Sequence, residues 1–264
     1  MRKQNSPSLI KKATIVTIVI FLAAFFLTSL WKGLKNSRYF KIKDVLDSQG
    51  MELTAFSYLK GRNIFNIDLK AESQDIQELY PNCQKIRLVR VMPNRLVIDF
   101  IKRIPVAYVK LFRFFCVDDE AVLFDVPRSS EFADLPIIVG LDTKIFGPKA
   151  GKAYNIMELK FALDVIKEIK NNKILEGYKI KRIDVLRPGN TSFLITAPQE
   201  ASPDPKEEVT AGIQGLDIKI GQDDIKDKIA TFSQLLIQLK KDWNNIRYID
   251  LRFKEPVIKF KDAK

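Results

Sequence analysis

The chain contains no histidine among its 264 residues, and this absence removes whole classes of chemistry. Without an imidazole there is no Ser-His-Asp triad, no Cys-His dyad and no histidine-ligated metal site. Cysteine is scarce as well, because Cys83 and Cys116 stand alone, without the Cys-x-x-Cys spacing of a zinc or redox site. The two cysteines either pair in an oxidising compartment or lie buried separately. Most familiar hydrolases are excluded, and we expect no metal and no cofactor.

One carboxylate cluster, at Asp118, Asp119 and Glu120, remains as a possible site for cation binding or acid–base catalysis. It lies between two apolar runs that read as strands, Phe114 to Val117 and Val122 to Phe124. A polar hairpin turn is the ordinary meaning of such a segment. No catalytic residue is therefore assigned.

A single long apolar run, Ala13 to Trp31, dominates the N-terminal part of the chain. Its 19 residues just cover a hydrocarbon core of roughly 30 Å. A cleaved secretory signal is the alternative, but the run is long for one and ends in Thr-Ser-Leu-Trp-Lys, without an A-x-A-like site. The sequence predicts an uncleaved anchor, with Trp31 at the membrane interface.

Positive charge is concentrated around this run. Residues 1–44 carry nine Lys or Arg and one acidic residue, a net of +8 out of +12 for the whole chain. Such juxtamembrane charge suits anionic lipid headgroups better than a nucleic-acid groove. Because positive charge lies on both sides of the run, the positive-inside rule favours a cytoplasmic N-terminal tail, with the folded domains outside the cytoplasmic membrane, without deciding it. We expect no nucleic acid and no small-molecule substrate.

After the anchor, residue patterns predict a small domain of order β-α-α-β-β. Its clearest part is a hairpin, Lys85 to Val91 and Arg95 to Lys102, joined by the turn Met92-Pro93-Asn94. The other predicted elements are a strand over Tyr39 to Val45, a short helix over Thr54 to Leu59 and a second helix over Ala71 to Tyr80.

The rest of the chain, residues 107–264, reads as a mostly antiparallel β domain with two packing helices. Apolar residues recur at helical spacing in Asn155 to Asn171 and again from Ile225 to Leu239, the second run preceded by Asp223 and Asp224 at its start. The end of the chain predicts two strands, Tyr248 to Phe253 and Val257 to Phe260, around the turn Lys254-Glu255-Pro256. A terminal strand is often a sheet edge, which another chain can extend.

The ordered set of local motifs resembles the FtsQ/DivIB family of bacterial cell-division proteins. It comprises the basic tail and span, Tyr39 to Ile42, Gly61 to Leu69, Val89 to Ile98, Arg103 to Tyr108, Phe115 to Asp118, Val122 to Phe124, Leu135 to Gly140, Ile218 to Gly221 and Tyr248 to Phe253. The chain departs from the family in two places: Glu120-Ala121 stands where a hairpin glycine is usual, and Pro198 to Glu208 looks inserted as a mobile loop.

The resemblance implies an α+β protein with a POTRA-like domain followed by the β domain. The boundaries we expect are 1–12 for the tail, 13–34 for the transmembrane helix, 35–106 for the POTRA-like domain and 107–264 for the β domain. It further implies a non-enzymatic divisome scaffold at the septum, which helps control septal peptidoglycan synthesis. The partners would be membrane-anchored coiled-coil proteins of the FtsB/FtsL or DivIC type. Carried over to this chain, the contact residues are Tyr248, Arg252, Phe253, Val257, Ile258 and Phe260.

Two interpretations of other classes stay open at this point. One is a membrane-tethered enzyme that acts on envelope polymer through Asp118, Asp119 and Glu120, or through a lone serine. The other is a secretion or envelope-assembly module that handles client chains by strand pairing. The hairpin pattern occurs once, which is unlike an array of POTRA repeats.

Overall fold

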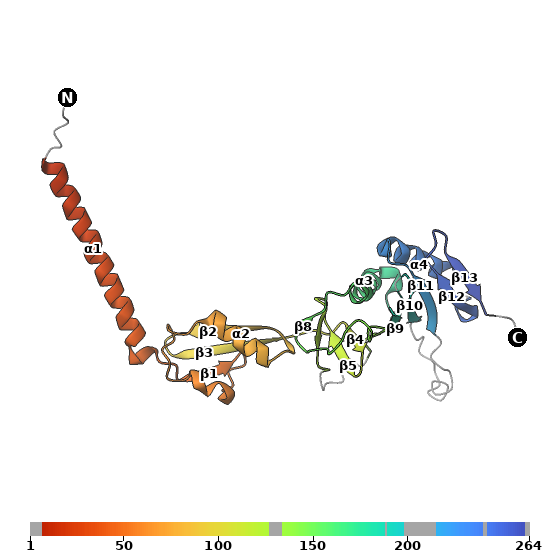
Figure 1. The fold of residues 1–264 in the computed structure, drawn as a ribbon, viewed down its shortest axis with the longest axis horizontal. Coiled ribbons are helices and arrows are strands. Elements are labelled where there is room, and N and C mark those ends of the chain that lie inside the picture. The colour runs from red at the N-terminus through yellow and green to blue at the C-terminus, as the bar shows by residue number, and fades with distance from the viewer. Residues whose placement is uncertain (1–6, 127–133, 188, 198–214, 240–241, 262–264) are drawn as a thin grey trace, which may run out of the picture. The chain divides into compact units, whose positions relative to one another are not determined.

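The computed structural model describes residues 7–126, 134–187, 189–197, 215–239 and 242–261. The predicted inserted loop, Pro198 to Glu208, lies outside these residues. The chain divides into two compact units, Met1–Lys102 and Arg103–Lys264, whose elements are labelled in Figure 1.

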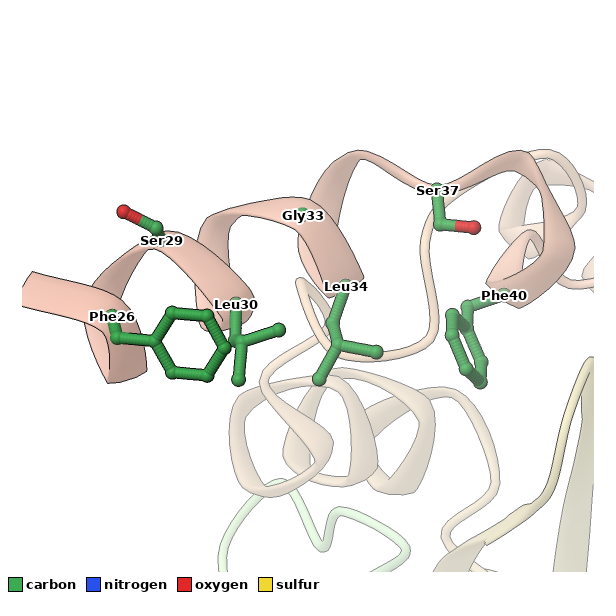
Figure 2. Close-up of a pocket in the computed structure, with 7 residues that line it drawn as sticks. All are labelled: Phe26, Ser29, Leu30, Gly33, Leu34, Ser37 and Phe40. Carbon is green, nitrogen blue, oxygen red and sulfur yellow. The ribbon is translucent and has the colours of Figure 1, made fainter. Parts of the chain in front are cut away.

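The anchor is helix α1, Pro7–Asn36, and its segment Thr14–Asn36 is long and apolar enough to cross a membrane. Its large apolar side chains are exposed, from Ile15 through Trp31, so no protein surface covers them. Such a helix is stable when lipid surrounds it. At its end, Phe26, Leu30, Leu34 and Phe40 line one side of an apolar groove (Figure 2).

The end of α1 is held by a side chain from elsewhere in the first unit. Asn63, only 7% exposed, donates from Nδ2 to the carbonyl oxygens of Leu34 (3.1 Å) and Ser37 (3.2 Å). Its Oδ1 accepts the backbone N–H of Phe65 at 2.9 Å. The last carbonyls of a helix lack intrahelical partners, and here Asn63 supplies one for Leu34. We call this contact the Asn63 clamp.

The remainder of the first unit has the predicted β-α-α-β-β order. Its elements are β1 (Asp44–Asp47), the 3₁₀ helix η2 (Thr54–Leu59), α2 (Leu69–Leu79), β2 (Cys83–Val91) and β3 (Arg95–Lys102). The strands pair in the order β1-β3-β2, with β2 and β3 antiparallel and β1 parallel to β3. Val45, Leu96 and Ile98 on the covered face of the sheet are fully buried.

The first predicted strand, Tyr39 to Val45, is wrong in its position. Residues Arg38–Phe40 form a 3₁₀ turn, η1, because the Ser37 hydroxyl accepts the backbone N–H of Tyr39 and closes a cap there. The Phe40 ring then packs at 5.1 Å from Phe65. The strand proper begins only at Asp44.

The second unit is built on a ten-stranded sheet of the described strands, in the order β13-β12-β11-β10-β9-β7-β4-β5-β6-β8. These strands are β4 (Ala107–Lys110), β5 (Phe114–Val117), β6 (Val122–Phe124), β7 (Ile137–Val139), β8 (Lys152–Ala153), β9 (Lys179–Asp184), β10 (Thr191–Thr196), β11 (Gly215–Ile220), β12 (Ile246–Asp250) and β13 (Val257–Phe260). Most neighbours are antiparallel, and the pairs β4–β7, β7–β9 and β11–β12 are parallel. The α+β class and the mostly antiparallel β domain are confirmed.

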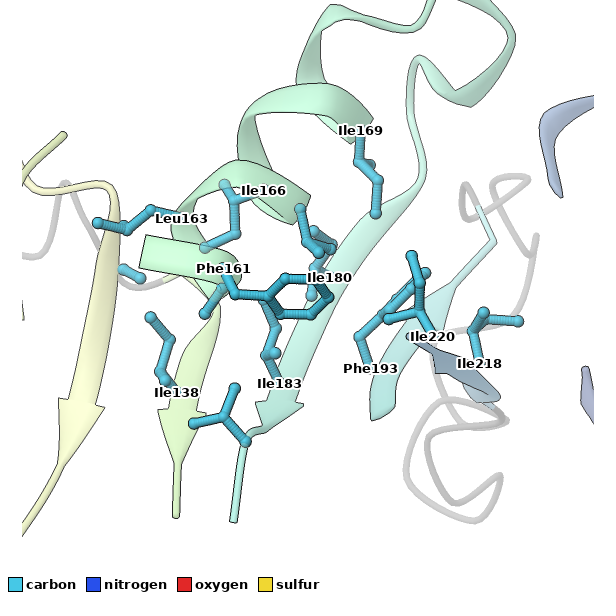
Figure 3. Packing of buried hydrophobic residues seen from close by; sticks show 14 of the residues in the cluster. Ile138, Phe161, Leu163, Ile166, Ile169, Ile180, Ile183, Phe193, Ile218 and Ile220 are labelled. Atoms are coloured by element: carbon cyan, nitrogen blue, oxygen red, sulfur yellow. The ribbon is translucent and has the colours of Figure 1, made fainter. Parts of the chain in front are cut away.

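Two helices pack on this sheet, α3 (Met157–Asn171) and α4 (Ile225–Leu239), followed by the short 3₁₀ helices η4 (Lys173–Leu175) and η5 (Trp243–Asn245). The predicted apolar faces are the buried ones: Leu159, Ile166 and Ile169 of α3 lie within the core. Figure 3 shows α3 over Ile180 and Ile183 of β9. Both helices therefore serve the core of this unit.

The carboxylate cluster forms the predicted hairpin turn between β5 and β6. Asp118 is buried and uses Oδ1 to accept the backbone N–H groups of Glu120 and Val122, while Oδ2 accepts a hydrogen bond from Arg103. Ala121 has a φ of 58°, a left-handed conformation that suits glycine better than alanine. Ala121 belongs to the Glu120-Ala121 pair that the resemblance predicts in place of a hairpin glycine.

The two cysteines are buried in different units. Cys83 belongs to the core of the first unit, and Cys116 is fully buried beside β4 in the second. Burial raises the pKa of the Cys116 thiol to about 11. Of the two alternatives left open by the sequence, the structure has the separately buried one.

Candidate protein-binding site

Strand β13 ends the sheet of the second unit. It pairs with β12 on one side, and among the described residues no strand pairs with its other side. The Lys261 N–H donates inward to the Asn245 carbonyl at 2.7 Å. Because main-chain groups alternate in direction along an antiparallel strand, the N–H groups of Ile258 and Phe260 point away from β12. An incoming strand therefore meets free donors at these two positions.

Apolar side chains are exposed along this edge. Phe253 is 59% exposed, Val257 48% and Phe260 49%, although each is large and apolar. Ile258 differs, since it lies opposite the fully buried Ile249 and packs on the core. Of the four apolar non-tyrosine residues in the predicted contact set, Ile258 therefore anchors the edge strand. Phe253, Val257 and Phe260 offer apolar surface.

Tyr248 lies on the opposite face of the sheet from Ile249. It pairs across the sheet with Lys259 of β13 and Asp217 of β11. The Lys219 ammonium lies 4.1 Å from the centre of its ring, a cation–π contact. The structure thus brings Tyr248 next to β13, on a face that carries charged residues.

Arg252 is committed to contacts inside the unit. Its Nε donates to Asp250 at 2.9 and 3.1 Å, and its Nη1 donates to Asn190 Oδ1 at 2.8 Å. The Asp250 carboxylate also accepts the Arg252 backbone N–H at 3.1 Å. This local loop ends β12 at Asp250, so the predicted strand over Tyr248 to Phe253 is wrong in both limits.

The Asp250–Arg252 pair has a clear electrostatic signature. Hydrogen bonds from the Arg252 guanidinium hold the pKa of the buried Asp250 carboxyl below its usual range, and they raise the pKa of Arg252. Sequence reasoning missed Asp250 and Asn190 as partners of Arg252. The spacing of two residues between Asp250 and Arg252 was a usable signal, whereas Asn190 is remote in sequence.

The described residues hold no group of three or more Cys, Asp or Glu side chains that could bind a metal ion. In the carboxylate cluster, Asp118 is bound to Arg103 and to backbone N–H groups, while Asp119 and Glu120 are exposed. These contacts give Asp118 a structural role in the turn.

Comparison with known proteins gives a consistent result. A sequence model described as "Cell division protein FtsQ/DivIB, C-terminal" matches residues 107–252. The chain is similar to a protein named cell division protein FtsQ from Syntrophotalea carbinolica, with 26% identity over 86% of this chain and 76% of the relative.

Two further relatives bear the same name. The protein from Geotalea daltonii is 20% identical over 83% of this chain and 70% of its own length. The protein from Koribacter versatilis is 20% identical over 75% of this chain and 52% of its own length. The family match includes β12 and the Asp250–Arg252 pair.

Proposed function

This chain belongs to the FtsQ/DivIB family of cell-division proteins, and from that premise we propose that it is a bitopic scaffold of the divisome. The helix α1 places it in the membrane as a single-pass protein, and its domains lie outside the cytoplasm at the division septum. There it links cytoplasmic and envelope division proteins and helps control septal peptidoglycan synthesis. Its output is assembly, and it performs no catalysis.

The observation that carries the proposal is the outer edge of β13, which no described strand pairs with, and on which Val257 and Phe260 are exposed. A strand added to this edge gains main-chain hydrogen bonds at Ile258 and Phe260, and apolar side chains select its sequence. We take the partner to be a membrane-anchored coiled-coil division protein of the FtsB/FtsL or DivIC type. Phe253, Val257 and Phe260 make direct contact in this complex, together with Tyr248. Ile258 and Arg252 stabilise the conformation of the edge without contacting the partner.

The test separates backbone pairing from side-chain contact at one position. The full chain in lipid nanodiscs is mixed with the membrane-anchored partner, and affinity is compared for Phe260→Ala and Phe260→Pro. Both variants lose the ring, but only proline removes the outward N–H. Since a hydrogen bond contributes about 1 kcal/mol and proline also crowds the incoming strand, we expect the proline variant to bind about tenfold more weakly than the alanine variant.

Two outcomes count against the proposal. Equal affinity of the two variants would mean that the partner does not pair with β13. If a chain that ends at Phe253, and therefore lacks β13, bound the partner with full affinity, the binding site would lie elsewhere. Circular dichroism and thermal melting of each variant establish that the fold is retained, because proline is tolerated on an edge strand when its N–H faces outward.

A further inference from the structure

Three basic side chains line an open pocket where the end of α1 meets the rest of the first unit. They are Lys35 at the end of α1, Lys70 in the first turn of α2, and Arg90 of β2. The pocket is completed by the segment Phe65 to Leu69. We call this feature the basic pocket.

Aromatic contacts fix Lys35 in this position. The Trp31 ring lies 5.8 Å from the Phe65 ring, and the Lys35 ammonium lies 5.6 Å from the centre of the Trp31 ring. The Asn63 clamp joins the same turn of α1 to the start of the loop. The Trp31 ring therefore contacts Lys35 directly, and the Asn63 clamp holds the helix turn that carries it.

Arg90 shapes the opposite wall. Its Nε donates to the Ile64 carbonyl at 2.8 Å, and its Nη2 donates to the Ile67 carbonyl at 2.7 Å. These bonds turn two acceptors of the loop toward the arginine. The one acidic residue that lines the pocket, Asp68, caps α2 by accepting the N–H groups of Lys70 and Ala71. The pocket keeps a net positive charge.

The depth of the basic pocket follows from the length of α1. Lys35 is one helical turn beyond Trp31, about 6 Å along the axis. The polar layer on each side of the hydrocarbon core is about 5–7 Å thick. A helix whose apolar run ends at Trp31 therefore carries Lys35 at the level of the lipid phosphates.

We propose that the basic pocket binds the headgroup of an anionic phospholipid, whose phosphate lies between Lys35 and Lys70. The inference rests on the membrane anchoring in the proposed function, and it adds a lipid-selective site to it. Charge complementarity and depth both favour a lipid in the same leaflet over a soluble anion. Each lysine near an anionic surface contributes about fivefold in affinity.

The probe is phosphatidylglycerol, compared with phosphatidylcholine, bound to the detergent-solubilised full chain and quantified by native mass spectrometry. The wild-type chain is expected to prefer phosphatidylglycerol by about fivefold or more, and Lys35→Gln/Lys70→Gln is expected to lose this preference. The matched control is Lys85→Gln/Lys226→Gln, which removes the same charge from exposed positions that do not line the pocket. Melting curves verify that all three proteins fold alike.

Several results would overturn the inference. These are a preference that survives in the pocket variant, an equal loss in the control, or displacement of the lipid by millimolar inorganic phosphate. Resistance of the chain to alkaline extraction from membranes is measured in parallel. A chain that is extracted would contradict the anchoring itself, whereas an anchored chain without lipid preference would contradict only the basic pocket.

Discussion

Asp250 and Arg252 illustrate how single residues in a candidate site also stabilise the fold. The side chain of Asp250 is 6% exposed and that of Arg252 is 30% exposed, so the ion pair is largely shielded from water. A buried carboxylate that loses its partner keeps the cost of desolvation without compensation. A loss of binding in an Arg252 variant would therefore not identify Arg252 as a contact residue.

We expect Arg252→Gln to lower the free energy of unfolding by about 1–3 kcal/mol at pH 7. The pKa of Asp250 is depressed in the folded chain, so its contribution is present above the unfolded value, near 4, and is lost as the pH falls through the folded pKa. The deficit of the variant should therefore shrink below about pH 4.

Chemical denaturation at pH 7, 4 and 3 measures this difference, with Arg247→Gln as the control at an exposed position of β12. A deficit that stays constant across this pH range would show that the pair does not titrate as described.

Residue identity predicted some conformations well and others poorly. The replacement Glu120-Ala121 was visible in the sequence, and Ala121 indeed occupies a left-handed conformation. Gly140 was only part of a motif, yet at its φ of 91° an added Cβ would lie 2.5 Å from the Leu186 backbone nitrogen. That close approach joins segments 46 residues apart, and no local pattern reveals it.

At the scale of elements, the spacing of apolar residues predicted helices and strands correctly where one face of the element is buried. The hairpin β2–β3 and the helices α3 and α4 lie where alternation and helical spacing predicted them. The parallel pairs β1–β3 and β11–β12 were not predictable, because register between distant strands is set by tertiary contacts. The candidate edge was predictable from its terminal position, but its outward N–H groups required the register of β12 and β13.

The Asn63 clamp supports a prediction about the joint between α1 and the first unit. Asn63→Ala removes both hydrogen bonds to the helix end, and each bond contributes about 1 kcal/mol. We expect the distance between spin labels at Asn36 and Glu78, measured by pulsed electron paramagnetic resonance, to become more broadly distributed. The native cysteines are buried and react poorly with the label.

Asn66→Ala is the matched control for this measurement, since Asn66 is exposed in the same loop. Unchanged distributions in both variants would show that the aromatic contacts alone hold the helix end.

At the scale of the whole molecule, the described residues form two hydrophobic cores. One cluster includes Val45, Leu59 and Leu96, and the other includes Phe115, Ile166 and Phe193. Each unit therefore excludes water from its own interior, and the two need not unfold together. The sequence predicted two folded units on another ground, the order of the expected elements: β-α-α-β-β first, then a β domain with two helices.

We expect calorimetry of the detergent-solubilised full chain to resolve two unfolding transitions. Leu96→Ala should destabilise only the first unit and Ile166→Ala only the second, each by about 2–5 kcal/mol, because both side chains are buried. If either substitution shifted both transitions equally, the two cores would unfold as one cooperative unit.

The clamp has a mechanical consequence. A transmembrane helix that is longer than the hydrocarbon layer tilts, and the tilt grows as the bilayer thins. Asn63 and Phe65 fasten the end of α1 to the rest of the first unit. We therefore expect the first unit to change its angle to the membrane when the local thickness of the bilayer changes.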